Sequence, residues 1–178
     1  MEGNEIYLII HVALPLIFSE IPTFKKTLRI KILIIIGALL PDLIDKPILL
    51  LGLGQGRALS HNLLFLLISF LIIFISSRKS FEISLSLLIG MVFHIILDLP
   101  EVPLFYPFVS YNFLVIEEPI FHWVTNLLTD PLYLLTEITG IGILIYIFIT
   151  NRLYHRSKFI KYLKGKSKSS IIIETKKE

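Results

Sequence analysis

The chain has 178 residues, of which 54% are hydrophobic and 17% are charged. Soluble domains are about 45–50% apolar and about 25% charged, so this composition indicates an integral membrane protein of one domain. The net charge is +3. No cysteine is present, and this excludes a disulfide framework and a metal site built from thiolates.

Five apolar segments follow one another along the chain, and we expect each of them to be a helix. They cover about residues 6–21, 30–51, 61–76, 81–99 and 131–150. A spanning helix needs about 20 apolar residues, with about 17 tolerated; the fourth and fifth segments meet this, whereas the first and third are short enough to be re-entrant or buried. Because only helices and closed barrels span lipid, and the alternating pattern of a barrel is absent from the sequence, we predict an all-α polytopic bundle.

Connections rich in lysine and arginine alternate with connections that have few of them, and this alternation predicts the orientation. The basic connections are residues 19–31, 76–82 and the tail from 152, and the connections with at most one basic residue are 1–5, 52–60 and 100–130. The positive-inside rule then places the N-terminus outside and the C-terminus in the cytoplasm. Acidic residues precede the first segment and no cleavage site follows it, so we expect it to stay in the mature protein. The prediction is a multi-pass domain of the cell (inner) membrane over residues 1–151 and a basic cytoplasmic tail, 152–178, that is disordered or lies along the inner leaflet.

The second segment carries two acids in an otherwise nearly apolar run. Asp42 and Asp45 are three residues apart, so both can share one face of a helix. Pro41 is expected to kink or break this helix. A charged Asp at the centre of a membrane helix costs about 2.5–3.5 kcal/mol, so it persists where water, a partner charge or a metal ion offsets the cost. Lys46 is such a partner, and a pair with one of the acids would remove a carboxylate from a metal site.

The predicted orientation places further polar residues at the same outer depth as these acids. His94 and Asp98 are four residues apart on one helix face; alone, they predict a hydrogen bond between two buried groups. Ser60 can cap the third segment, whose dipole would keep His61 neutral, as a ligand requires. We predict a metal site with the candidate ligands His11, Asp42, Asp45, His61, His94 and Asp98. Imidazole with carboxylate suits Zn²⁺, with Mn²⁺ or Fe²⁺ as alternatives.

The connection 100–130 is rich in proline and aromatic residues and is expected to be a lid or rim at the outer interface. Arg57 either clamps a phosphate or carboxylate of the substrate or is an interfacial residue that snorkels. Candidates for a general base or a further ligand, or for a solvated surface, are Glu117, Glu118 and His122. His155 lies in the tail and is not expected to belong to the site.

Together these residues resemble a known family. The pattern consists of His11, Gly37-x3-Pro41-Asp42-x2-Asp45, Arg57-x2-Ser60-His61-x2-Leu64, His94-x3-Asp98 and Leu104-Phe-Tyr-Pro107-Phe108. It is similar, over about residues 7–112, to the YdjM-type family of membrane-bound, predicted metal-dependent hydrolases. That family resembles zinc-dependent phospholipase C and P1 nuclease in ligand order, which implies phosphoester hydrolysis. The second His/His-x3-Glu set of those enzymes is not found in this sequence, which favours one or two ions over three.

The sequence thus predicts a metal-dependent hydrolase that acts at the outer membrane boundary on a phosphoester or lipid-linked substrate. Asp42, His61, His94 and Asp98 would be ligands; His11 and Asp45 would complete a second ion or support the first. The candidate catalytic residues are Asp45, Arg57 and Glu118. The bilayer is the expected partner, and no nucleic acid is expected.

Two other functions use the same cluster. A metal or ion transporter would spread polar residues across the full membrane thickness, whereas here they gather on one side. A non-catalytic membrane protein would use the cluster only to hold its helices together.

Overall fold

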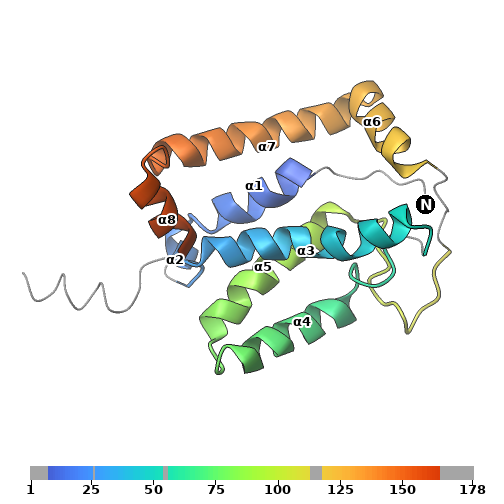
Figure 1. The fold of residues 1–178 in the computed structure, drawn as a ribbon, viewed down its shortest axis with the longest axis horizontal. Helices are drawn as coiled ribbons and strands as arrows, with labels where there is room; N and C mark the ends of the chain where they lie inside the picture. Colours follow the sequence, from blue (N-terminus) through green and yellow to red (C-terminus); the bar gives the residue numbers. More distant parts are fainter. Residues whose placement is uncertain (1–7, 26, 54–55, 113–117, 165–178) are drawn as a thin grey trace, which may run out of the picture.

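The structure is a computed structural model that describes residues 8–25, 27–53, 56–112 and 118–164, and every regular element in these residues is a helix (Figure 1). The elements are α1 (Leu8–Phe18), α2 (Pro22–Lys25), α3 (Lys31–Leu50), α4 (Leu63–Ser76), α5 (Phe81–Leu97), α6 (Pro119–Thr129), α7 (Pro131–Thr150) and α8 (Arg156–Lys164). The predicted all-α class is confirmed. Each of the five apolar segments contains one helix of 11 to 20 residues, because a saturated apolar run gains most when its backbone is hydrogen-bonded internally.

The helices differ in their capacity to cross a membrane. Among the described helices, α7 alone is both long and apolar enough to span a bilayer, judged by length and composition. The apolar helices α1, α4 and α5 have 11, 14 and 17 residues. The five spans and the orientation of the termini therefore stay predictions.

Three expectations about local structure are corrected. The helix α3 continues through Pro41, so of the kink or break that was predicted there, the break is wrong. Residues 119–129 of the predicted outer loop form α6, which begins with proline at its first position. Residues 156–164 of the tail form α8 rather than a disordered segment, and Tyr162 of this helix lies under the ammonium group of Lys31. The rest of the tail, 165–178, lies outside the described residues.

Two glycines let α3 and α5 lie side by side with their backbones in contact. A Cβ atom at Gly37 would lie 2.1 Å from the carbonyl oxygen of Leu87, and one at Gly90 would lie 2.2 Å from the carbonyl oxygen of Ile34. No side chain larger than hydrogen fits either position without moving a backbone. The close approach brings the second halves of both helices, with their acids and histidine, to one place.

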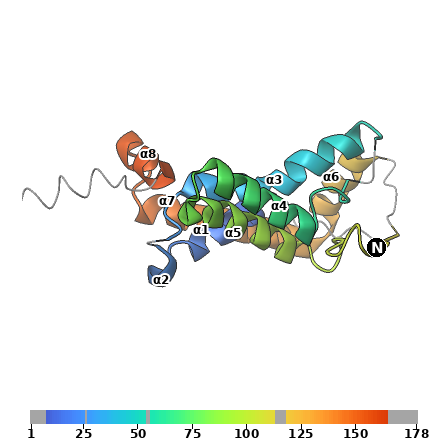
Figure 2. The same cartoon turned by 90° about the horizontal axis from the view of Figure 1, so that it is seen from below.

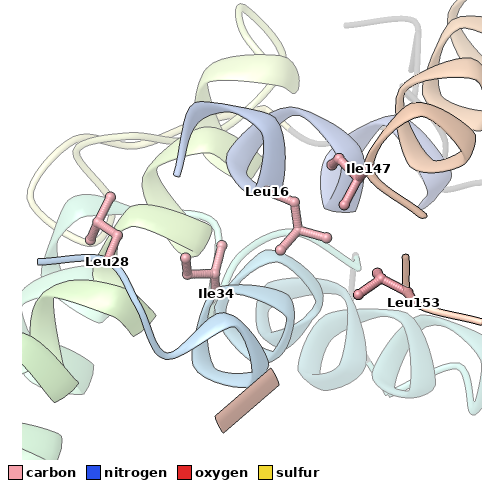
Figure 3. Close-up of a cluster of buried hydrophobic side chains, with 5 residues drawn as sticks. All are labelled: Leu16, Leu28, Ile34, Ile147 and Leu153. Carbon is pink, nitrogen blue, oxygen red and sulfur yellow. The ribbon is translucent and has the colours of Figure 1, made fainter. Parts of the chain in front are cut away.

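The apolar side chains form two cores and a large outer surface. Leu16, Leu28, Ile34, Ile147 and Leu153 join α1, α3 and α7 (Figure 3). Leu66, Leu87, Met91, Ile95 and Val102 join α4, α5 and the segment after it. Many other apolar side chains are exposed along α4, α6 and α7. Large exposed apolar surfaces of this kind are typical of contact with a partner protein or a membrane. The short helices α6 and α8 lie at opposite ends of the bundle (Figure 2).

Candidate metal centre

All six predicted ligands meet in one buried cluster. His11 comes from α1, Asp42 and Asp45 from α3, and His94 from α5, while Asp98 ends α5 and His61 precedes α4. Each of the six residues is at most 9% exposed. Buried charges need a partner charge or a metal ion, so the way these side chains pair decides what the cluster can hold.

The ring of His94 has a defined tautomer. Its Nδ1 atom lies 2.7 Å from the carbonyl oxygen of Ala38. A carbonyl oxygen can only accept, so Nδ1 carries the proton and donates it. In the neutral ring, Nε2 therefore presents a lone pair to the cluster.

Asp45 orients His61 in the same way. The Nδ1 atom of His61 lies 2.8 Å from Oδ2 of Asp45, which also accepts from the backbone N–H of Ser60 at 3.0 Å. An ionised carboxylate only accepts, so Nδ1 of His61 donates and Nε2 of the neutral ring has the lone pair. The hydroxyl of Ser60 donates to the carbonyl of Pro41 at 2.8 Å, which fastens this segment to α3. Asp45 thus has the place of the carboxylate that holds a ligating histidine.

Four electron-rich atoms converge at the centre of the cluster. The Nε2 atoms of His61 and His94 are 3.1 Å apart. Oδ1 of Asp42 lies 3.5 and 3.7 Å from these two nitrogens, and Oδ2 of Asp98 lies 3.5 and 3.3 Å from them. With both rings neutral, no hydrogen lies between these atoms and they repel one another; a metal ion, or a proton on one of the nitrogens, would remove the repulsion. The donor set of nitrogen and carboxylate oxygen fits Zn²⁺, Mn²⁺ or Fe²⁺.

His11 extends the cluster toward α1. Its Nε2 atom lies 2.9 Å from Oδ1 of Asp98, and its ring centre lies 4.3 Å from that of His94. Two sets of three residues have ligand atoms within 4.8 Å of one another: His11, His94 and Asp98, and Asp42, His61 and His94. Either set could hold a metal ion, and the two sets share His94.

Lys46 pairs with Asp42 as the sequence suggested, but the carboxylate is not lost to the cluster. The ammonium group lies 2.8 Å from Oδ2 of Asp42, while Oδ1 of the same carboxylate faces the two histidines. The ammonium also lies 5.1 Å from the ring centre of Trp123 in α6. A cation over an aromatic face is attracted by the ring, so Lys46 links the centre to α6.

The predicted residues outside this cluster take other places. Arg57 pairs with Glu101 at 3.1 Å. Glu118 is exposed at the start of α6 and lines a groove with Leu50 and Phe121. The side chain of His122 is hydrogen-bonded to that of Asn126, four residues later in α6. Glu117 lies outside the described residues.

The sequence missed three features of the centre. Asn62, not Ser60, caps α4, since its side chain accepts from the N–H of Phe65 at 2.8 Å; His61 therefore precedes the helix instead of lying in its first turn. The carbonyl of Ala38 has no sequence signal. Glu137 of α7 contacts the start of α1, and its acid in an apolar run was the signal that could have found it.

Fold and centre together define an all-helical protein with one helix able to span a membrane, among the described helices, and with a buried His/Asp cluster that could hold a metal ion. The chain belongs to the YdjM family, described as YdjM inner membrane protein, whose model matches residues 7–159. This match confirms the resemblance and the inner membrane localisation, and it includes α7, which the resemblance left out. No curated protein and no solved structure matches the chain. The similarity to phospholipase C and P1 nuclease stays a prediction.

Proposed function

We propose that this chain is a metal-dependent hydrolase of the inner membrane that cleaves a phosphoester or lipid-linked substrate at the outer boundary of the bilayer. The observation that carries the proposal is the meeting of the Nε2 atoms of His61 and His94 with two carboxylate oxygens in a buried place. His11, Asp42, His61, His94 and Asp98 would hold one or two divalent ions, with Zn²⁺ the first choice and Mn²⁺ or Fe²⁺ the others.

A bound divalent ion supplies an acidified water and polarises a phosphoryl or acyl oxygen. The chain supplies the positioning. Asp45 holds the ring of His61 through Nδ1 and keeps Nε2 directed at the centre. Lys46 places a positive charge beside Asp42, where it would attract an anionic group of the substrate.

The contacts of the three candidate catalytic residues limit the role that each could have. Arg57 would clamp an anionic group only by leaving Glu101. Glu118 would act as a base only if α6 moves it toward the centre, because its side chain is exposed at the start of that helix. Asp45 would accept a proton only through His61, which occupies its Oδ2 atom.

The membrane setting supports a lipid-linked substrate. The family is one of inner membrane proteins, and apolar side chains of α4 and α7 are exposed over their length. A substrate that enters from the bilayer would reach the centre without crossing water. The proposal includes the predicted topology of five spans with an outer N-terminus.

The test is metal content followed by hydrolysis. Purified protein is analysed for transition metals per chain, then assayed on p-nitrophenyl phosphate and on phospholipid vesicles, before and after chelation and with Zn²⁺ or Mn²⁺ restored. We expect a stoichiometric metal and hydrolysis that chelation abolishes and the ion restores, with H94A inactive. Protein that carries no transition metal ends the proposal.

The burial of all six residues favours a second function, in which a bound cation has only the structural role of holding α1, α3 and α5 together. This function predicts a stoichiometric metal and a lower melting temperature after chelation, but no hydrolysis of either substrate.

A further inference from the structure

Glu137 is a buried acid on α7, 8% exposed, in an otherwise apolar helix. Its Oε2 atom accepts from the backbone N–H of Ile9 at 3.3 Å, and its Oε1 atom accepts from that of Ile10 at 3.4 Å. The first four N–H groups of a helix have no partner inside the helix, and the first turn of α1 contains no acid of its own. An acid on α7 therefore caps α1, and its charge also complements the dipole of that helix.

A second contact holds the same turn. Gly140 lies one turn beyond Glu137 on α7, and a Cβ atom there would lie 2.9 Å from the nitrogen and 3.0 Å from the Cα of Ile10. The two backbones therefore touch where the carboxylate binds. His11 is the next residue, so α7 holds the chain directly before a candidate ligand.

The helix α1 has little stability of its own near this ligand. Pro15 lies inside α1, and because proline has no N–H it cannot donate to the carbonyl of His11, four residues earlier. Isolated helices shorter than about 12–15 residues are marginal, and α1 has 11 residues. The position of His11 thus depends on what α1 packs against more than on the helix itself.

We propose that Glu137 is a positioning residue for the metal centre. By capping α1 it sets His11 against Asp98, 2.9 Å away, and beside the ring of His94, and so completes the donor set of these three residues. Its effect on metal binding rests on the proposed function; its effect on the place of His11 does not.

The first test uses Zn²⁺ alone as the probe, with affinity measured by chelator competition. E137M keeps the length of the side chain and removes both acceptor oxygens, and we expect it to weaken binding by about 10-fold, the lower end of what loss of a group bonded directly to a ligand costs, because Glu137 acts on His11 through the backbone. H11A should weaken binding as much, and the double variant E137M/H11A should be no weaker than H11A, because both changes act through one residue. E137Q keeps an acceptor oxygen and should recover most of the affinity.

The matched control is D130A. Asp130 caps the first turn of α7 itself by accepting from the N–H of Leu132 at 2.8 Å, so this variant removes an acid from α7 without touching the cap of α1. Zn²⁺ affinity close to that of the wild type is expected. The size-exclusion profile and the helix content establish whether each variant is folded. If E137M does not fold, E137A replaces it.

The second test needs no metal. The ¹⁵N signals of His11, assigned with H11A, report its bond to Asp98, and we expect them to shift in E137M and to stay in D130A and E137Q. If the wild type binds no Zn²⁺, the proposed function fails and these signals still decide whether Glu137 positions His11. Wild-type signals of His11 in a folded E137M or E137A variant would overturn the proposal.

Discussion

His61 and His94 face each other through Nε2 atoms 3.1 Å apart, although each ring already donates its other N–H to an oxygen, Asp45 in one case and Ala38 in the other. Two neutral imidazoles so held cannot hydrogen-bond to each other. A cation between them removes the repulsion, and two carboxylates are at hand to complete its shell.

His94 belongs to both sets of ligands, which makes it the histidine whose loss costs most. We expect His94→Ala to reduce bound metal to nearly none, and His11→Ala, which touches one set, to reduce it less. Elemental analysis of purified protein measures this. His155→Ala, an exposed histidine between α7 and α8, is the control and should keep its metal. A His94→Ala variant with full metal content would contradict the site.

Asp45 and Asp42 are predicted to differ although they lie one turn apart. Asp45→Asn weakens the orientation of His61 and should lower metal affinity about 10–100-fold while the stoichiometry at saturation is kept. Asp42→Asn removes an atom of the centre itself and should lower the stoichiometry. Chelator competition combined with elemental analysis separates the two effects. Equal loss of stoichiometry in both variants would make Asp45 a ligand, which is one of the two roles that the sequence left open for it.

The glycines between α3 and α5 should tolerate no side chain. Gly37→Ala or Gly90→Ala places a Cβ within 2.2 Å of a backbone oxygen and forces the two helices apart. Overpacking of this kind costs about 1–3 kcal/mol or more, and metal content should fall as well because α3 and α5 supply the ligands. Thermal unfolding in detergent measures the loss. Gly142→Ala, where no atom lies within 4 Å, is the control and should leave the melting temperature unchanged or higher.

The pair of Arg57 and Glu101 is expected to support structure before chemistry. Arg57 donates to the side chain of Glu101 at 3.1 Å and lies 3.4 Å from its carbonyl, so it holds the chain beyond α5. We expect Arg57→Ala and Glu101→Ala each to lower the melting temperature, with the double variant close to either single one. Metal content should stay at the wild-type level. Additive losses would show that Arg57 acts through another partner.

Glu20, between α1 and α2, gives a pH dependence with a defined sign. Burial acts to raise the pKa of Glu20, but its hydrogen bond with Lys25 and the charge of Lys31 outweigh burial and hold the pKa below its ordinary value of 4.5. A carboxyl group whose pKa is lower in the folded state than in the unfolded state stabilises the fold at a pH above its ordinary pKa. This stability is lost as the pH falls through the pKa of the folded state. The melting temperature of wild type should therefore exceed that of Glu20→Gln at neutral pH and converge with it in acid. A difference that persists in acid would contradict the assignment.

The expected helices were found because long Ile/Leu/Phe runs leave the backbone few alternatives. α7 begins at Pro131 and ends at Thr150, as the sequence predicts. The short helices α6 and α8 were missed, because α6 lies in a long connection interrupted by prolines and α8 in a basic polar tail. The contact of Lys31 with Tyr162 of α8 is long-range and has no local sequence signal.

The sequence by itself determined which residues to examine, because an acid or imidazole in an apolar run is too costly to persist without a partner. Only the tertiary structure decided their roles. Asp42 and Asp45 have the same side chain and lie three residues apart on one helix, yet one directs an oxygen at the histidines and the other holds the far nitrogen of His61. That difference comes from the segment before α4, where Ser60 is hydrogen-bonded to Asp45 and to the carbonyl of Pro41. The place of Glu137 is likewise decided by tertiary contacts, since its partners lie 127 and 128 residues away along the chain.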